Sequence, residues 1–342
     1  MATVSRLRFK PDGFLLAMLG AVALAALYPA PGAAGGFLHM GAVTGVGIAL
    51  VFFLHGADLS TDSLKVGVKN WRLHLFVQAA TFLLFPLIGF GVVMSMRRAL
   101  PFELLLGFFY LCALSSTISS SVALTAMAKG NVPGAIFNAT LSGLLGMFIT
   151  PILVGLVVST HGQALPVAQA ILDIVIKLLL PFAVGHLSRP LLAAWMARHK
   201  SLLNRVDRGV IVLIVYGAFC QSAQAGLWSS YGAGQTGLVV LMTAVLLLVV
   251  LASTTRLSRA LGFSTQDEIA AVFCGSKKSL ANGIPIAKVL FAGSPALGMI
   301  VLPIMVYHQL QLFLCTLLAR RYAARAERHA AQRQPCGVGD EI

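Results

Sequence analysis

Charged residues are scarce in this sequence. Asp, Glu, Lys and Arg make up 11% of the 342 residues, whereas hydrophobic residues make up 58%. This balance excludes a soluble globular domain. Apolar runs of about 20 residues, the length that crosses a bilayer as a helix, recur along the chain. The sequence therefore predicts an all-α, multi-pass integral membrane protein.

Acidic residues are scarcer than basic ones, which gives a formal net charge of +14. The basic residues lie at the ends of apolar segments and no soluble part remains, so we expect no nucleic-acid partner. The five cysteines have neither disulfide nor metal spacing. The HExxH, CxxC and Walker sequences and a Ser-His-Asp set are also missing, so we expect neither an enzyme nor an ATP-driven pump.

Ten apolar segments are expected to span the membrane, and an even number places both termini on one side. Most of the 25 Lys and Arg lie on that side, whereas the opposite loops contain only Arg97 and Arg98. The positive-inside rule then places both termini in the cytoplasm, and the protein in the inner or plasma membrane. The segments lie near 13–30, 37–55, 73–95, 103–128, 132–158, 166–188, 208–227, 236–255, 268–292 and 296–318.

Five segments lie within residues 13–160 and five within residues 161–319. An odd number per half gives the two halves opposite orientations, which is the pattern of an inverted repeat. Residues 320–342 are basic and are expected to contact anionic membrane lipid. The expected parts are a cytoplasmic N-terminal segment (1–12), a first five-helix repeat (13–160), a second, inverted repeat (161–319) and a cytoplasmic tail (320–342).

The fourth and ninth segments are counterparts in such a repeat, and both carry polar residues in the middle. They read LCALSSTISSSV from Leu111 and FCGSKKSLANGI from Phe273. Lys277, Lys278 and Asn282 lie where hydrocarbon should be, and ionisable residues at this depth indicate functional sites. We expect both segments to break and cross near the midplane, where helix ends offer amide dipoles to anions and carbonyls to cations.

Several longer motifs resemble those of one known family. They are FFLHGADLSTDSLK from Phe52, VQAATFLLFPLIGFG from Val77, AMAKGNVPGAIFNATLSGLLGMFITP from Ala126, FCGSKKSLANGIPIAKVLF from Phe273 and IVLPIMVYHQLQLF from Ile300. On these motifs the chain resembles the bile acid:sodium symporter superfamily, in particular the symporter-like branch that includes the vertebrate member A7 of solute carrier family ten.

The resemblance implies a panel of spans one, two, six and seven and a core of spans three to five and eight to ten. In sodium-coupled members, cations bind beside the crossing of spans four and nine. Their ligands are polar groups of spans four and five, a glutamine of span three, and a Glu and a Gln of span nine. The organic anion lies between core and panel, whose relative motion exposes it to each side in turn.

The sequence departs from this pattern in span nine. The family's carboxylate has no counterpart, because Phe273 or Cys274 aligns near it and Lys277 near the glutamine. A fixed ammonium repels a second cation in a partly dry site. We therefore hypothesise that Lys277 or Lys278 replaces at least one sodium ion, which leaves sodium as a possible coupling ion and no other cofactor. The lysines could also anchor an anionic substrate or bind carbonyls of the broken helix.

Two groups of site residues are expected, although their hydroxyls and His308 could instead satisfy nearby carbonyls. Substrate contacts are expected from Lys277, Lys278, Asn282, Ser116, Thr117 and His308. A second group is expected to bind a coupling ion or to supply a substitute for it: Ser115, Ser120, Ser121, Gln78, Asn138, Thr140 and Lys277. Two structural expectations complete the set: an intrahelical pair of Asp173 with Lys177, and a helix-packing face at Gly41 and Gly45.

The sequence thus predicts a secondary transporter that moves a small organic anion by alternating access. The alternative is a membrane regulator or scaffold with the same fold and no transport. An open, polar cavity between panel and core, lined by Lys277, Lys278 and Asn282, would favour the transporter. No oligomeric state is predicted.

Overall fold

The computed structural model describes residues 13–33, 35–59, 69–160, 166–226 and 233–333, and all regular structure in these ranges is helical. Seven of the described helices are long and apolar enough to cross a membrane. The prediction of an all-helical integral membrane protein is therefore confirmed. The seven are Met40–Asp58, Trp71–Met96, Val132–Ser159, Val167–Arg198, Lys200–Gln224, Gly237–Ala260 and Leu297–Arg328.

The three remaining expected spans fall on α1 (Gly13–Leu27) and on two pairs of short helices. In the first pair, α6 (Phe102–Ala113) is followed by α7 (Ser119–Met127). In the second, α14 (Thr265–Ser276) is followed by α15 (Leu280–Leu290). Both breaks coincide with the polar stretches that were expected to interrupt the helices.

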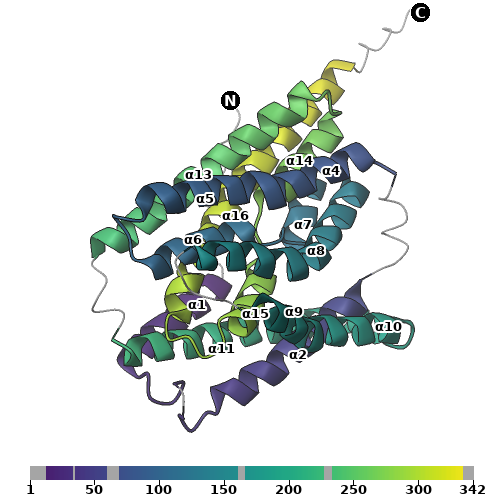
Figure 1. Ribbon diagram of the computed structural model, residues 1–342. Helices are drawn as coiled ribbons and strands as arrows, with labels where there is room; N and C mark the ends of the chain where they lie inside the picture. The colour runs from purple at the N-terminus through teal and green to yellow at the C-terminus, as the bar shows by residue number, and fades with distance from the viewer. Residues whose placement is uncertain (1–12, 34, 60–68, 161–165, 227–232, 334–342) are drawn as a thin grey trace, which may run out of the picture.

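Four helices form a layer in the lower part of Figure 1. In this four-helix layer, α2 packs against α10 and α11, and α1 packs against α11. The bounds are Met40–Asp58 for α2, Leu180–Arg198 for α10 and Lys200–Gln224 for α11.

Two glycines bring α2 and α10 into backbone contact. A Cβ at Gly56 would overlap the carbonyl of Phe182, and one at Gly185 would overlap the carbonyl of Phe53. The prediction of a packing face at Gly41 and Gly45 is wrong, because a Cβ at either position meets no described atom within 4 Å. Helix α2 therefore approaches α10 through Gly56, near its other end.

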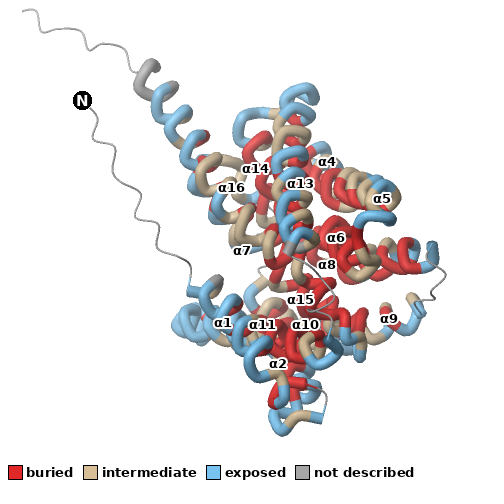
Figure 2. The backbone as a smooth tube through the Cα atoms, turned by 90° about the vertical axis from the view of Figure 1, so that its left-hand side faces the viewer, coloured by how far each residue is buried: buried red, intermediate tan, exposed pale blue. Residues whose placement is uncertain are grey.

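Most of the remaining helices form a larger body above this layer, with α6 at its centre, whereas α9 continues through η2 into α10 of the layer. Helix α6 packs against α5, α8 and α16, and Figure 2 shows it as almost entirely buried. Helix α15 contacts α11 on one side and α16 on the other, so it lies between the layer and the body. Further bounds are α4 (Trp71–Ala79), α5 (Phe85–Met96), α8 (Val132–Ser159), α9 (Val167–Ile174), α13 (Ala233–Ala260) and α16 (Leu297–Arg333).

Two long helices contain a π-helical segment, each just before a proline. The segments are η1 (Ala80–Leu84), before Pro86, and η2 (Val175–Leu179), before Pro181. Proline has no N–H to donate, and π-bulges are one way in which a helix accommodates the lost bond. Near η2, the Lys177 Nζ lies 2.9 Å from Asp173 Oδ2, which confirms the expected intrahelical pair.

Candidate functional site

The two helix breaks touch each other inside the larger body. The N–H of Ser279 donates to the carbonyl of Ser115 at 2.9 Å. The Oγ of Ser116 donates to the carbonyl of Cys274 at 2.7 Å. Both breaks contain extended backbone, with ψ of 157° at Leu114 and 148° at Lys277. The chain segments that join α6 to α7 and α14 to α15 are therefore bonded directly, as the sequence predicted for crossing helices.

The ammonium group of Lys278 is held in a cage of carbonyl oxygens. Its Nζ donates to Leu114 O at 2.6 Å, to Cys112 O at 2.8 Å and to Thr81 O at 3.0 Å. It also lies 4.0 Å from the centroid of the Phe85 ring, within the range of a cation–π interaction. All three donor hydrogens of the ammonium thus have partners.

The three carbonyls are available because local structure leaves them without backbone donors. Cys112 and Leu114 end α6, and the last carbonyls of a helix have no intrahelical partner. At Thr81, the π-helical turn sends the N–H of Phe85 to Ala80 O instead. The next residue is Pro86, which has no N–H to offer.

Side chains of α16 and α6 hold the backbone around Lys278. Gln311 accepts from the N–H of Lys278 at 2.8 Å and donates to its carbonyl at 2.9 Å. Tyr307 donates to Ser276 O at 2.5 Å, and Tyr110 donates to Gly283 O at 2.6 Å. The sequence analysis did not single out Tyr110, Tyr307 or Gln311. Each of the three places a polar atom inside an apolar span, and this sequence feature could have identified them.

Lys277 differs from its neighbour. Its side chain is also fully buried, yet its Nζ has no hydrogen-bonding partner among the described residues. Only the ammonium of Lys278 is therefore held by acceptors among the described residues.

The residues expected to bind an ion divide into bonded and unbonded groups. Gln78 Nε2 donates to the carbonyl of Asn138 at 3.2 Å, and Asn138 Nδ2 donates to Gly134 O at 2.9 Å. Ser121 Oγ donates to Phe273 O at 3.2 Å. Ser115 Oγ and Gln78 Oε1 are buried without a partner among the described residues. Gln78 and Ser121 thus join helices, as polar side chains in membrane bundles commonly do, whereas the Asn138 side chain bonds within α8.

A cavity of about 650 Å³ lies between the four-helix layer and the larger body. Five of the predicted site residues line it: Thr117, Ser120, Thr140, Asn282 and His308. In contrast, none of the predicted Lys277, Lys278, Ser115, Ser116, Ser121, Gln78 and Asn138 lines this cavity.

The structure places Lys277, Lys278 and Ser116, which are expected to contact substrate, away from the lining of this cavity. Lys278 turns to carbonyls inside the body, and Ser116 donates to Cys274 O. Lys277 is fully buried beside them.

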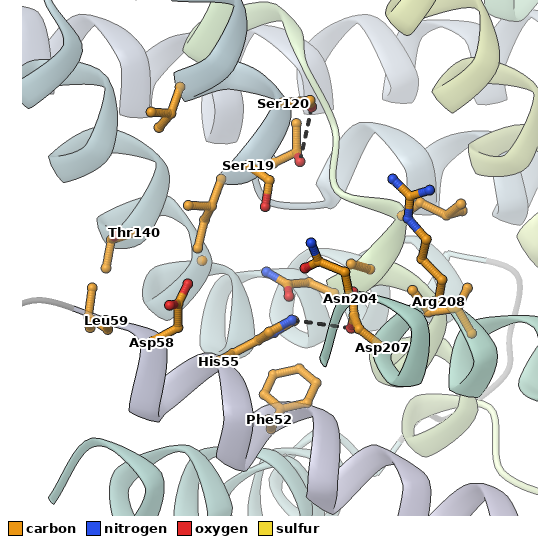
Figure 3. A pocket seen from close by; sticks show the side chains of 18 of the residues that line it. Phe52, His55, Asp58, Leu59, Ser119, Ser120, Thr140, Asn204, Asp207 and Arg208 are labelled. Atoms are coloured by element: carbon orange, nitrogen blue, oxygen red, sulfur yellow. Dashed lines mark hydrogen bonds and ion pairs between the residues drawn. The ribbon is translucent and has the colours of Figure 1, made fainter. Parts of the chain in front are cut away.

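Polar residues of the four-helix layer also line the cavity, and the sequence analysis missed them. Figure 3 shows His55 and Asp58 from α2 opposite Asn204, Asp207 and Arg208 from α11. His55 Nε2 lies 3.3 Å from Asp207 Oδ1. These residues lie near the end of α2 and the start of α11. From the sequence, charged residues at such positions were assigned to the loops between spans and not to a site.

Two helix N-termini meet the cavity from the larger body. Ser119 and Ser120 begin α7, and Leu280, Ala281 and Asn282 begin α15. The residue before α7, Ile118, provides no side-chain cap. N-terminal amides carry unsatisfied donors and a partial positive charge, which favour an anion.

Thr140 supplies a further polar group in this wall of the cavity. Its side chain is 4% exposed, and its Oγ1 has no hydrogen-bonding partner among the described residues. A buried hydroxyl without a partner is costly, so a ligand that bonds to it gains free energy.

The other end of the four-helix layer is bonded to the larger body. Near the end of α11, Ser222 Oγ donates to Pro295 O at 2.6 Å and accepts from the N–H of Gly298 at 3.2 Å. The layer and the body thus enclose a cavity near the start of α11 and are joined near its end.

Comparison with known proteins places the whole chain among membrane transporters. The chain is 46% identical to an uncharacterized protein of Pseudomonas aeruginosa, PA2026, over 96% of this chain and 98% of that one. It is 43% identical to the putative symporter YfeH of Escherichia coli, over 94% and 96% of the two chains. It is 29% identical to sodium/bile acid cotransporter 7 of Danio rerio, over 91% and 93%.

The relatives confirm the resemblance to bile acid:sodium symporters that the motifs indicated. They also agree with the expectation that the chain is a transporter and not an enzyme. Residues 12–324 match the sequence model of one family, which covers nearly all of the described helices. This multi-pass membrane protein therefore belongs to the SBF-like CPA transporter family.

Proposed function

We propose that this protein is a secondary transporter that carries a small organic anion by alternating access. The observation that carries the proposal is the cavity between the layer and the body, where α7 and α15 both begin. Paired helix N-termini favour a carboxylate or sulfonate, and Thr140 and Asn282 can donate to it. A cavity of about 650 Å³ is of the size that holds a small molecule.

In this proposal the chain crosses the membrane ten times as two inverted repeats, residues 13–160 and 161–319. The four-helix layer corresponds to the panel of the family and the larger body to the core. The crossing of α6–α7 and α14–α15 supports this, since one broken helix comes from each half of the chain. Residues 1–12 and 334–342, which belong to the expected terminal segments, lie outside the described residues.

The termini are proposed to lie in the cytoplasm. The cavity is lined by the start of α1, the end of α2 and the start of α11, at Phe14, Asp58 and Lys200. These three helix ends lie on the side of the termini in the ten-span arrangement. With Ser222 bonded to the body at the opposite end, the conformation corresponds to an inward-open state.

Lys278 is proposed to occupy the place of a coupling sodium ion. Three carbonyl oxygens around one cationic centre resemble a sodium site in donor type, with a tethered ammonium as the cation. A second cation next to this charge is opposed by several kcal/mol in a partly dry site. We therefore expect transport to be weakly dependent on sodium or independent of it, although relatives carry sodium in their names.

The experiment uses purified protein in detergent and in proteoliposomes. A panel of carboxylates and sulfonates is tested for an increase in Tm and then for uptake, in sodium chloride and in choline chloride. A ligand that binds the folded state raises Tm in proportion to its occupancy. We expect at least one small anion to stabilise the protein and to be taken up in both salts.

Two outcomes would contradict parts of the proposal. Uptake that strictly requires sodium would contradict the role of Lys278 and leave the transporter in place. No stabilisation and no uptake by any anion would favour the alternative, a scaffold that keeps the fold without transport.

A further inference from the structure

A second groove lies between α13 and α16, apart from the cavity described above. Its volume is about 410 Å³, and residues of only these two helices line it. From α13 they are Leu248, Leu251, Ala252, Thr255, Arg256 and Arg259, and from α16 they are Leu314, Leu317, Leu318 and Arg321. Both sets recur at spacings of three and four, so each helix contributes one continuous stripe.

The groove is apolar at one end and basic at the other. The stripes begin at Leu248 and Leu314 and end at Arg259 and Arg321. Figure 1 shows α13 and α16 side by side, running in the same direction toward the upper right. Because the helices run in the same direction, their arginines gather at the same end of the groove.

Two of the three guanidinium groups have no acidic partner in the part of the chain that the structure describes. Arg259 donates to Glu268 Oε1 at 3.0 and 2.8 Å, and Tyr322 donates to the same oxygen at 2.7 Å. Arg256 and Arg321 are exposed and form no ion pair with the residues that the structure describes. The basic end of the groove therefore carries an uncompensated positive charge.

The depth of the arginines matches a membrane surface. Arg321 lies about 36 Å along α16 from Leu297, at 1.5 Å per residue, and the hydrocarbon core is about 30 Å thick. The leucines of the groove then lie beside acyl chains and the arginines beside headgroups.

We propose that this groove binds one anionic phospholipid. Its phosphate is held by Arg256 and Arg321, and one acyl chain lies along the leucines of both helices. Guanidinium groups bind phosphate through charge-assisted, often bidentate hydrogen bonds. Basic pockets between membrane helices are suited to anionic headgroups. This inference does not depend on which solute the protein carries.

The test measures Tm of the full-length protein in detergent with added lipid. Palmitoyl-oleoyl phosphatidylglycerol is compared with phosphatidylcholine of the same acyl chains. We expect phosphatidylglycerol to raise Tm by a few degrees more than phosphatidylcholine, because only the folded groove binds the anionic headgroup. In the double variant Arg256→Gln/Arg321→Gln this difference should disappear.

The matched control is Arg320→Gln/Arg328→Gln. It removes the same charge from exposed positions of α16 that do not line the groove, and should keep the difference. Equal loss in both double variants, or equal stabilisation by both lipids, would overturn the proposal. So would the same rise with inorganic phosphate, because the ligand would then not be a lipid.

A second measurement covers the case in which the groove variant does not fold. Native mass spectrometry of the wild-type protein counts the lipids that are retained after detergent removal. Preferential retention of one phosphatidylglycerol supports the site, and equal retention of both lipids contradicts it.

Discussion

Lys277 and Lys278 are neighbours in the chain and are equally buried, yet only the ammonium of Lys278 has hydrogen-bonding partners among the described residues. Their side chains leave extended backbone, where successive residues point in opposite directions. One faces the carbonyls that end α6, and the other does not. We therefore expect the two lysines to contribute differently to the free energy of unfolding.

Lys278→Met is expected to destabilise the protein. It leaves the carbonyls of Thr81, Cys112 and Leu114 buried without a donor, which should cost about 3 kcal/mol or more. Lys277→Met is the matched control and should leave Tm unchanged or raised, because it removes a buried amine that has no partner. Thermal unfolding in detergent compares the two. Equal losses would contradict the difference between the lysines.

Sodium is expected to stabilise Lys278→Ala but not the wild type. The substitution removes the ammonium and leaves three carbonyl oxygens around an empty space, which a small hard cation can fill. The measurement is Tm in sodium chloride against choline chloride at equal ionic strength. A sodium-dependent rise of equal size in the wild type would show that Lys278 does not replace the ion.

Thr140→Val is expected to impair transport without destabilising the protein. The change keeps the shape of the side chain and removes a buried hydroxyl that has no partner among the described residues. Loss of one hydrogen bond to a charged ligand, about 1.5 kcal/mol, should raise the KM for anion uptake about tenfold. Tm should stay the same or rise slightly. A lower Tm with an unchanged KM would assign Thr140 to packing.

Gly298→Val is expected to open the end of the molecule near Ser222. A Cβ at Gly298 would come within 2.6 Å of Ser222 Oγ and 3.3 Å of the carbonyl of Ala218. Overpacking costs about 1–3 kcal/mol, enough to shift a conformational equilibrium at least about fivefold toward the open end. Uptake should fall. The control is Gly91→Val, where a Cβ meets no described atom within 4 Å, and which should retain uptake.

The sequence was sufficient to locate the helix breaks. Clustered Ser and Thr in the first apolar run, and Lys, Asn and Gly in the second, conflict with a continuous membrane helix, and the structure interrupts the helix at both places. Ser279 and Asn131 also act as N-caps, accepting from the N–H groups of Asn282 and Gly134. The breaks depend on short segments of the chain, so local sequence predicts them.

The sequence was not sufficient to distinguish Lys277 from Lys278 or to place them relative to the cavity. The partners of the Lys278 ammonium lie 164 to 197 residues away. One of them, Thr81 O, is available only because of a π-helical turn and Pro86. The cavity depends in the same way on α2 and α11, whose polar ends meet only in the folded protein. Contacts of this kind follow from packing between distant segments.

The backbone contact of α2 with α10 at Gly56 and Gly185 restricts how the molecule can move. With no side chain between them, neither helix can shift past the other unless the pair first separates. The two helices are therefore expected to move together as one rigid unit. The flexibility that any conformational cycle requires then lies at other contacts, such as those of α11 with α15 and α16.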